Sequence, residues 1–266
     1  MNKDKTVIEK PIFIFGCPNS GTTILWEAMK SHEGVSGPDI EGQDLEGMPR
    51  QMRHYMGNST FRLWAHYLFA QGEEIVPGSN LTYYVTENNW TEDAETQLRQ
   101  AYENHFDPET RLCDKSPAHA LRARFLQRCF PDADFVAIVR DGYAVSEGIR
   151  RKREFDPDRP KYRGLRTRIE DAAYQWNKSN EIIASYEELR FLDRLLTIKY
   201  EDLVQNTEET LHRVLNFCGL DKCDFRIPVF SAGKNEEQIA RLSAYEIEVI
   251  SEIATPMLRR FGYDVR

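Results

Sequence analysis

The stretch GCPNSGTTIL, residues 16–25, sets two glycines and three hydroxyl side chains directly after a short apolar run. Glycines let a backbone approach a ligand closely, and the N–H groups at a helix N-terminus favour an anion. The stretch therefore predicts a phosphate-binding loop, for which a plain strand-to-helix turn with hydroxyl capping is the alternative. Gly16 and Gly21 have the spacing of nucleotide triphosphatase loops, but Thr22 stands where those loops need lysine. That difference disfavours a kinase or an ATPase.

Composition limits the class of protein. The chain has 266 residues, 41% of them hydrophobic, which suits one domain over residues 1–266. Its net charge of −8 argues against a nucleic-acid or anionic-membrane partner. No apolar stretch approaches the roughly 20 residues that span a bilayer, and the five cysteines contain no C-x-x-C pair, so we expect a cytoplasmic protein. The sequence carries no signature of an oligomeric state.

The hydrophobic pattern alternates short strands with helices. Continuous apolar runs predict strands at residues 11–15, 134–139 and 195–199, since strands of a parallel sheet are covered on both faces. Helical spacing predicts helices from about residue 20 to 31 and at residues 118–130, 143–152, 171–189 and 208–218. This order predicts an α/β fold with a P-loop-like parallel sheet flanked by helices. Residues 34–110 have weaker periodicity and are expected to form a helical and loop insertion that covers the active site.

Several segments together resemble one family. GCPNSGTT resembles the 5′-phosphosulfate loop of sulfotransferases that use 3′-phosphoadenosine 5′-phosphosulfate (PAPS), whose common form is G-x-P-[R/K]-S-G-T-T. Residues 112–142 resemble the family's lysine-containing strand end, helix, strand and 3′-phosphate motif, in the same order. KYEDL and the C-terminal SAGKNEEQ and PMLRRFGYD segments are similar to later family segments. The run RDG at residues 140–142 looks most like the tyrosylprotein sulfotransferases and their bacterial relatives.

The resemblance implies a site for PAPS as co-substrate and for its product adenosine 3′,5′-bisphosphate (PAP), without a metal. Arg140 would bind the 3′-phosphate with its forked guanidinium, and a salt bridge with Asp141 or Glu147 is the alternative. Tyr200 would lie near the nucleotide, and a place in the core is the alternative. The other implied ligands come from the phosphate loop, a helix after Arg140 and a covering loop: Pro18, Asn19, Ser20, Gly21, Thr22, Thr23, Lys152, Ser231 and Lys234. A solvated loop is the alternative for Ser231 and Lys234.

Two positions depart from the family's pattern. Asn19 replaces the arginine or lysine expected near the transferred group. Lys115 in CDKSP resembles a catalytic lysine of the tyrosylprotein branch and is expected to supply more of the charge, with a lysine ordered by Asp114 or Glu46 as the alternative. The serine partner of Arg140 belongs eight residues beyond it, where this chain has Gly148. Ser146 is the predicted substitute if the turn after Arg140 is two residues shorter, because within an unchanged helix the two positions differ by about 200°.

The resemblance places the catalytic base in the loop after the first helix, which holds carboxylates at Asp39, Glu41, Asp44 and Glu46. Glu41 is the predicted base, because it lies within about one residue of the glutamate of the tyrosylprotein branch and a partly desolvated carboxylate can accept a hydroxyl proton. A solvated acidic loop is the alternative, and His32 is the second candidate base.

Sulfuryl transfer needs cationic or hydrogen-bonding groups on the sulfuryl oxygens and a base for the acceptor's proton. The predicted function is transfer of a sulfuryl group from PAPS to a hydroxyl of a small metabolite, glycoside or lipid. The predicted catalytic residues are Asn19, Glu41 and Lys115. Aromatic residues of the insertion line either the acceptor site or a local core: Trp64, Tyr67, Phe69, Tyr83, Tyr84 and Trp90. The alternatives are a protein-tyrosine acceptor, or a protein that binds the nucleotide without transferring sulfate.

Overall fold

The computed structural model describes residues 7–52, 85–154, 168–225 and 233–266. In this part of the chain five parallel strands form one sheet in the order β2-β3-β1-β4-β5. Their bounds are Ile12–Gly16 for β1, Val35–Ser36 for β2, Arg111–Lys115 for β3, Asp134–Val139 for β4 and Leu195–Lys199 for β5. In the register, Ile14 pairs with Lys115 and Gly16 pairs with Ile138. Because the strands are parallel, the chain leaves β1, β3, β4 and β5 at one edge of the sheet.

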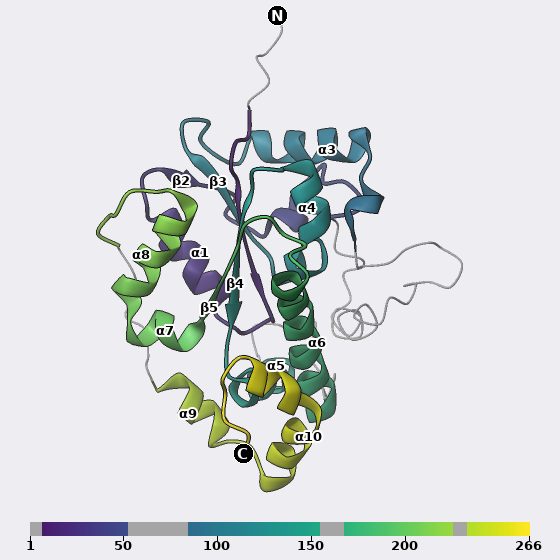
Figure 1. Cartoon of the computed structure of the whole chain (residues 1–266), viewed down its shortest axis with the longest axis vertical. Coiled ribbons are helices and arrows are strands. Elements are labelled where there is room, and N and C mark those ends of the chain that lie inside the picture. Colours follow the sequence, from purple (N-terminus) through teal and green to yellow (C-terminus); the bar gives the residue numbers. More distant parts are fainter. Residues whose placement is uncertain (1–6, 53–84, 155–167, 226–232) are drawn as a thin grey trace, which may run out of the picture.

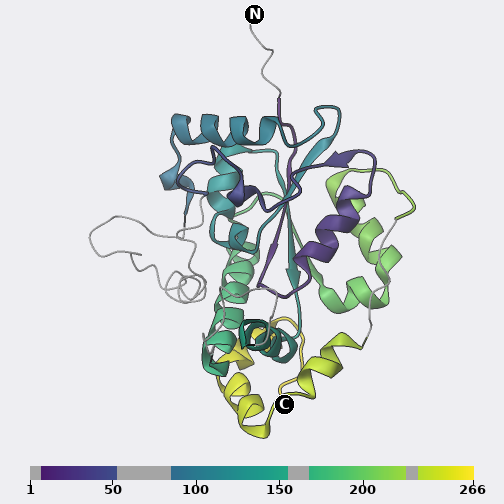
Figure 2. The same cartoon turned by 180° about the vertical axis from the view of Figure 1, so that it is seen from behind.

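Helices cover both faces of the sheet. Ile12 and Ile14 point into a core shared with α1 (Thr22–Lys30) and α8 (Thr207–Cys218). Phe13 and Phe15 alternate to the other face, where they pack with residues of α3 (Glu92–Glu103), α4 (Ala123–Cys129) and α6 (Ile169–Glu188). Figure 1 shows α1 and α8 on one side of the strands and α4 and α6 on the other, and Figure 2 shows the same layers from behind.

A third apolar cluster joins the helices beyond the carboxyl edge of the sheet. It contains Cys17, Tyr143 and Trp176, together with residues of α5 (Gly142–Glu154) and α10 (Ala244–Arg260). In Figure 1 the arrowheads of β1 and β4 point toward α5, α9 (Lys234–Ile239) and α10. A short helix, α7 (Tyr200–Gln205), follows β5 directly. The carboxyl edge is therefore enclosed by the C-terminal part of the chain.

The fold class predicted from the sequence is confirmed, and the three predicted strands lie within one residue of their predicted bounds. The single helix predicted at residues 118–130 is wrong. A 3₁₀ helix, Pro117–Leu121, and α4 replace it, separated by Arg122 with φ −130° and ψ 1°. The break turns the buried Arg122 guanidinium inward, where it donates to Gln43 Oε1 at 3.1 Å.

The described parts of residues 34–110 belong to the sheet and the core. β2 pairs with β3, and α3 buries Leu98 and Tyr102 completely after a start capped by Thr91. Figure 1 places α3 near the N-terminal end of the molecule, opposite α9 and α10. Trp90 packs against the core and donates to Glu95 Oε2 at 2.7 Å, whereas the other predicted acceptor-site aromatics, residues 64–84, lie outside the described residues. None of the helices in the described ranges is both long and apolar enough to cross a bilayer.

Candidate functional site

The loop between β1 and α1 has a backbone that only certain residues can adopt. Asn19 has φ 69° and Gly21 has φ 96°, both in the left-handed region. A Cβ on Gly21 would lie 2.6 Å from Cδ2 of Tyr200, so glycine is required there both by conformation and by space. Asparagine is among the few non-glycine residues that tolerate a left-handed backbone, which gives a local reason for Asn19.

The loop leads into the N-terminus of α1 and places hydrogen-bond donors there. No side chain caps the N-terminus of α1, where Gly21 is the cap residue, and the first N–H groups of a helix have no partner within it. The Ser20 side chain is fully buried, and its hydroxyl oxygen has no hydrogen-bond partner among the described residues. Thr22 is buried and Thr23 is exposed. A buried hydroxyl beside free N–H groups fits an anion site.

Arg140 follows β4 directly and is only 6% exposed. Its Nη1 donates to the backbone oxygen of Asn19 at 2.8 Å, so it reaches the phosphate loop. Its Nε donates to Asn235 Oδ1 at 2.8 Å and its Nη2 to Gln238 Oε1 at 2.6 Å, both on α9. The guanidinium lies 4.1 Å from the ring centroid of Tyr200. Arg140 thus contacts the loop, α7 and α9.

Buried polar groups hold the backbone around Arg140. Trp176 Nε1 donates to the Arg140 carbonyl at 2.9 Å, and Asp141 Oδ1 accepts from the first N–H groups of α5. Glu201 Oε1 accepts from the Asp141 N–H at 3.0 Å and from Asn235 Nδ2 at 2.6 Å. Burial lowers the pKa of Arg140. Burial also raises the pKa of Asp141, although the hydrogen bonds from the N–H groups of α5 act in the opposite direction. A guanidinium stays protonated despite such a shift, so Arg140 remains a cation.

The face of α5 toward the loop carries Gly148 and not Ser146. A Cβ on Gly148 would lie 3.7 Å from the Asn19 Cβ and 2.6 Å from Gln238 Nε2. Because α5 is continuous from Gly142, Ser146 points about 200° away from Gly148, and its buried hydroxyl lacks a partner among the described residues. The assignment of Ser146 as the serine partner of Arg140 stays a prediction.

The predicted base and the predicted catalytic lysine form an ion pair. Lys115 Nζ donates to Glu41 Oε1 at 2.8 Å, with side chains 7% and 28% exposed. Ser116 and Gln43 donate to the other carboxylate oxygen, at 3.4 Å and 2.5 Å. Lys115 also lies 5.5 Å from the ring centroid of Trp26 on α1. Two residues that are 74 positions apart in the sequence thus meet at the end of β3.

A fully buried network lies beneath this pair. Asp114 accepts from the Gly42 N–H at 2.8 Å and from the Tyr102 hydroxyl at 2.5 Å, and its Oδ2 lies 3.0 Å from His119 Nε2. Burial alone would raise the pKa of Asp114, but His119, Tyr102 and Gly42 together hold it below its ordinary value. A Cβ on Gly42 would lie 2.1 Å from Asp114 Oδ2, so the residue after Glu41 must be glycine. The network fixes the loop that carries Glu41.

The remaining predicted residues differ in their surroundings. His32 is held structurally, since its Nδ1 accepts from the Gly34 N–H and its Nε2 lies 2.9 Å from the Asp221 carbonyl, so it is not a free base. Lys234 begins α9 and pairs with Glu237 at 3.0 Å. Pro18 is half-buried in the loop. Ser231 and the side chain of Lys152 lie outside the described residues.

With this geometry in view, the chain can be compared with known proteins. The sequence profile described as "Sulfotransferase family" matches residues 11–224. The chain belongs to this family. It is 27% identical over 283 residues to a "Protein-tyrosine sulfotransferase" of Drosophila melanogaster, covering 95% of this chain and 51% of that protein. It is 27% identical over 280 residues to "Protein-tyrosine sulfotransferase 2" of Gallus gallus, covering 95% and 69%. This sulfotransferase thus spans about half the length of the Drosophila relative.

Solved structures support the fold of the sulfotransferase. The sulfotransferase domain of the Synechococcus olefin synthase superposes with a TM-score of 0.57 at 20% identity, covering 98% of both chains. A sulfotransferase from Alicyclobacillus acidocaldarius gives 0.56 at 13% identity, covering 97% and 98%. A mouse sulfotransferase solved with PAP gives 0.51 at 13% identity, covering 95% and 86%. The family predicted from the motifs is confirmed.

Sequence reasoning missed the residues that support the site. Asp114 and Glu201 lie inside the segments CDKSP and KYEDL, next to residues that were predicted, and their hydrogen-bond partners were the missing information. Asn235 and Gln238 are three positions apart on α9, a spacing that puts two amides on one helix face and is visible in the sequence. Gly42 carries no sequence signal beyond its position after Glu41.

Proposed function

We propose that this sulfotransferase moves a sulfuryl group from PAPS to a hydroxyl acceptor, as a single domain over residues 1–266. One observation carries the proposal: the anion loop, Arg140 and the Glu41–Lys115 pair gather beyond the ends of β1, β4 and β3. Ligands of open α/β sheets bind beyond the carboxyl ends of the strands. A donor with phosphates at two positions and a sulfuryl group matches this set of donors and cations.

In the proposed complex the loop holds the 5′-phosphate. The buried hydroxyl of Ser20 supports this assignment, because a buried hydroxyl without a partner is costly and an anion would satisfy it. Thr22, Thr23 and the N–H groups of α1 add donors, while Pro18 and Gly21 shape the backbone. Because the loop supplies backbone and side-chain donors, it can bind a phosphate without the lysine that nucleotide triphosphatase loops use.

Arg140 is the proposed 3′-phosphate ligand, since it is a buried cation that already reaches the loop at Asn19. The Tyr200 ring packs against the Arg140 guanidinium. The proposal adds Lys152 from α5 and the covering residues Ser231 and Lys234 as further donors to the nucleotide.

The reaction itself requires one proton transfer and one leaving oxygen. The bond between sulfur and the bridging phosphate oxygen breaks as a bond from sulfur to the acceptor oxygen forms. Glu41 takes the acceptor's proton, and Lys115 stabilises the charge on the bridging oxygen that leaves with PAP. The 2.8 Å contact between the two side chains supports a shared site. Asn19 donates a hydrogen bond there but brings no charge.

The acceptor is proposed as a hydroxyl of a small metabolite, glycoside or lipid. A protein tyrosine is the second candidate, favoured by the names of the Drosophila and Gallus relatives. The two are separated by supplying p-nitrophenol, a panel of sugars and alcohols, and a tyrosine peptide flanked by acidic residues, and by following PAP release and sulfated product.

Calorimetric titration with PAP tests the site before any acceptor is known. The wild type is expected to bind PAP, Arg140→Ala to lose most of the affinity, and ATP with magnesium to bind to neither. Absence of PAP binding would refute the proposed function. PAP binding without transfer to any member of the acceptor panel would favour a nucleotide-binding protein that lacks catalysis.

A further inference from the structure

The guanidinium of Arg140 is held by oxygens of its own chain. Two of its three bonds go to α9, to Asn235 Oδ1 at 2.8 Å and to Gln238 Oε1 at 2.6 Å. Both amide side chains are buried, at 9% and 3% exposure. These oxygens occupy the Nε and Nη2 donors, which form one of the two bidentate faces of the guanidinium and could otherwise hold two phosphate oxygens.

The nitrogen ends of the same amides are already engaged. Gln238 Nε2 donates to the Ala144 carbonyl and to Glu147 Oε2, both at 3.0 Å. Asn235 Nδ2 donates to Glu201 Oε1 at 2.6 Å. Reversing either amide would point its oxygen at a carboxylate. The orientation is therefore fixed, and the two amides present their oxygens to Arg140 as acceptors.

The absence of a side chain at position 148 makes the Gln238 contact possible. A Cβ on Gly148 would lie 2.6 Å from Gln238 Nε2, so a side chain at position 148 would displace the end of the Gln238 side chain. Gly148 stands where the resemblance calls for a serine. In this chain Gln238 fills the space that a side chain at 148 would occupy, and it reaches Arg140 from there.

We propose that Asn235 and Gln238 are affinity-setting residues of the nucleotide site, whose amide oxygens compete with the 3′-phosphate for Arg140. This inference rests on the proposed function. The amides of α9 thus act as an internal ligand: the phosphate takes the Nε and Nη2 donors of Arg140 only after the amide oxygens release them. Loss of an amide oxygen therefore strengthens binding of a 3′-phosphorylated nucleotide, whereas an ordinary ligand residue would weaken it.

The test uses Gln238→Met, which keeps the volume and removes the acceptor, and Asn235→Ala as an independent second variant. Calorimetry measures the Kd of PAP and of adenosine 5′-monophosphate, which lacks the 3′-phosphate. One hydrogen bond to Arg140 corresponds to about a three- to tenfold lower Kd for PAP in each variant. The Kd of the monophosphate is expected to stay within twofold, and thermal unfolding of each variant verifies folding.

The possible outcomes separate the competition from the proposed function. Tighter PAP binding with unchanged monophosphate binding supports the competition. Weaker or unchanged PAP binding in folded variants overturns it while leaving the nucleotide site intact, and weaker binding would make the amides ligands. Equal strengthening for both nucleotides would also overturn it, because the effect would not involve the 3′-phosphate. If neither wild type nor variants bind PAP, the proposed function itself fails.

Discussion

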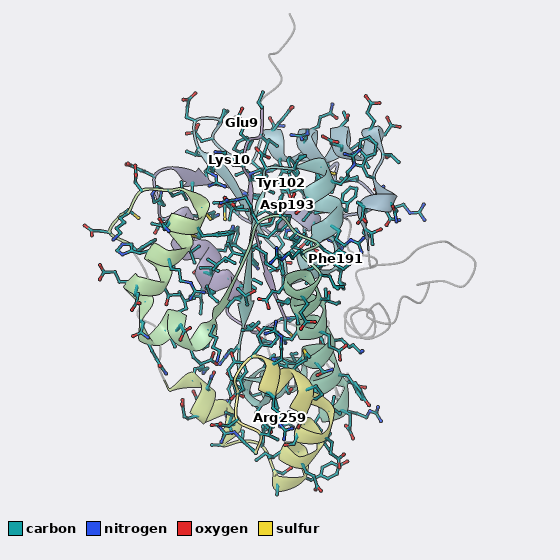
Figure 3. The ribbon with its side chains drawn as sticks, in the orientation of Figure 1. Glu9, Lys10, Tyr102, Phe191, Asp193 and Arg259 are labelled. Atoms are coloured by element: carbon teal, nitrogen blue, oxygen red, sulfur yellow. The ribbon has the colours of Figure 1, made fainter. Side chains whose placement is uncertain are left out.

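Replacing Tyr102 by phenylalanine tests the buried network beneath Glu41. The substitution keeps the ring, which lies fully buried where the end of α3 meets the sheet, and removes the hydroxyl that donates to Asp114 at 2.5 Å (Figure 3). A hydrogen bond to a charged acceptor contributes about 1.5–3 kcal/mol, and Asp114 is fully buried. We expect Tyr102→Phe to lower the free energy of unfolding by about 2 kcal/mol at pH 7.

The loss should depend on pH. The folded pKa of Asp114 lies below its ordinary value, so the stability from its carboxylate is present above the unfolded pKa of about 3.9 and is lost as pH falls through the folded value. Removing the Tyr102 donor raises the folded pKa and reduces that stability. The difference between variant and wild type should therefore be largest near neutral pH and shrink below about pH 4.

Tyr186→Phe is the matched control. Tyr186 is also buried, and its hydroxyl donates to the neutral Ala120 carbonyl at 2.6 Å, so its removal should cost about 1 kcal/mol without this pH dependence. Urea unfolding of the three proteins between pH 7 and pH 3 gives both numbers. Equal losses for the two variants, or a Tyr102→Phe loss that does not change with pH, would refute an ionised Asp114.

Three further changes test the site. Gly21→Ala should abolish PAP binding by calorimetry, because its Cβ would lie 2.6 Å from an aromatic ring carbon. Gly233→Ala, whose Cβ meets nothing within 4 Å among the described residues, should bind PAP normally. Gly42→Ala places a Cβ 2.1 Å from Asp114 Oδ2 and should slow PAP formation from PAPS roughly tenfold with PAP affinity unchanged, so an unaltered rate would contradict the positioning of this loop. Glu41→Gln should slow PAP formation by about 10²–10⁴ with PAP affinity unchanged, and a rate near wild type would remove Glu41 as the base.

The sheet was predictable because its strands are buried on both faces. The run at Asp134–Val139 is apolar after its first residue, and every residue in it is buried, as parallel strands between helix layers require. α3 also has a helical signal, with Ala94, Leu98, Ala101 and Tyr102 on one face after the cap at Thr91. It was missed inside a region treated as an insertion. β2 has two residues, too few for any period to show.

The residues of the candidate site were also predictable only in part. The loop and Arg140 were predictable because local chemistry and position at a strand end identify them. The partners of Arg140 on α9 were not, because contacts between residues 95 and 98 positions apart arise from tertiary packing. Ser146 stays a prediction for a related reason: the sequence left the length of the turn after Arg140 open, and α5 begins at Gly142.

The two departures from the family's loop and helix patterns turn out to be neighbours in space. A Cβ on Gly148 would lie 3.7 Å from the Asn19 Cβ, and the Asn19 carbonyl accepts from Arg140. Asn19 suits a left-handed backbone, and Gly148 leaves the room that Gln238 fills. The two positions that depart from the family's pattern therefore lie beside each other at the Arg140 end of the site, where α9 supplies oxygens to the guanidinium. Lys115, at the end of β3, pairs with Glu41 instead.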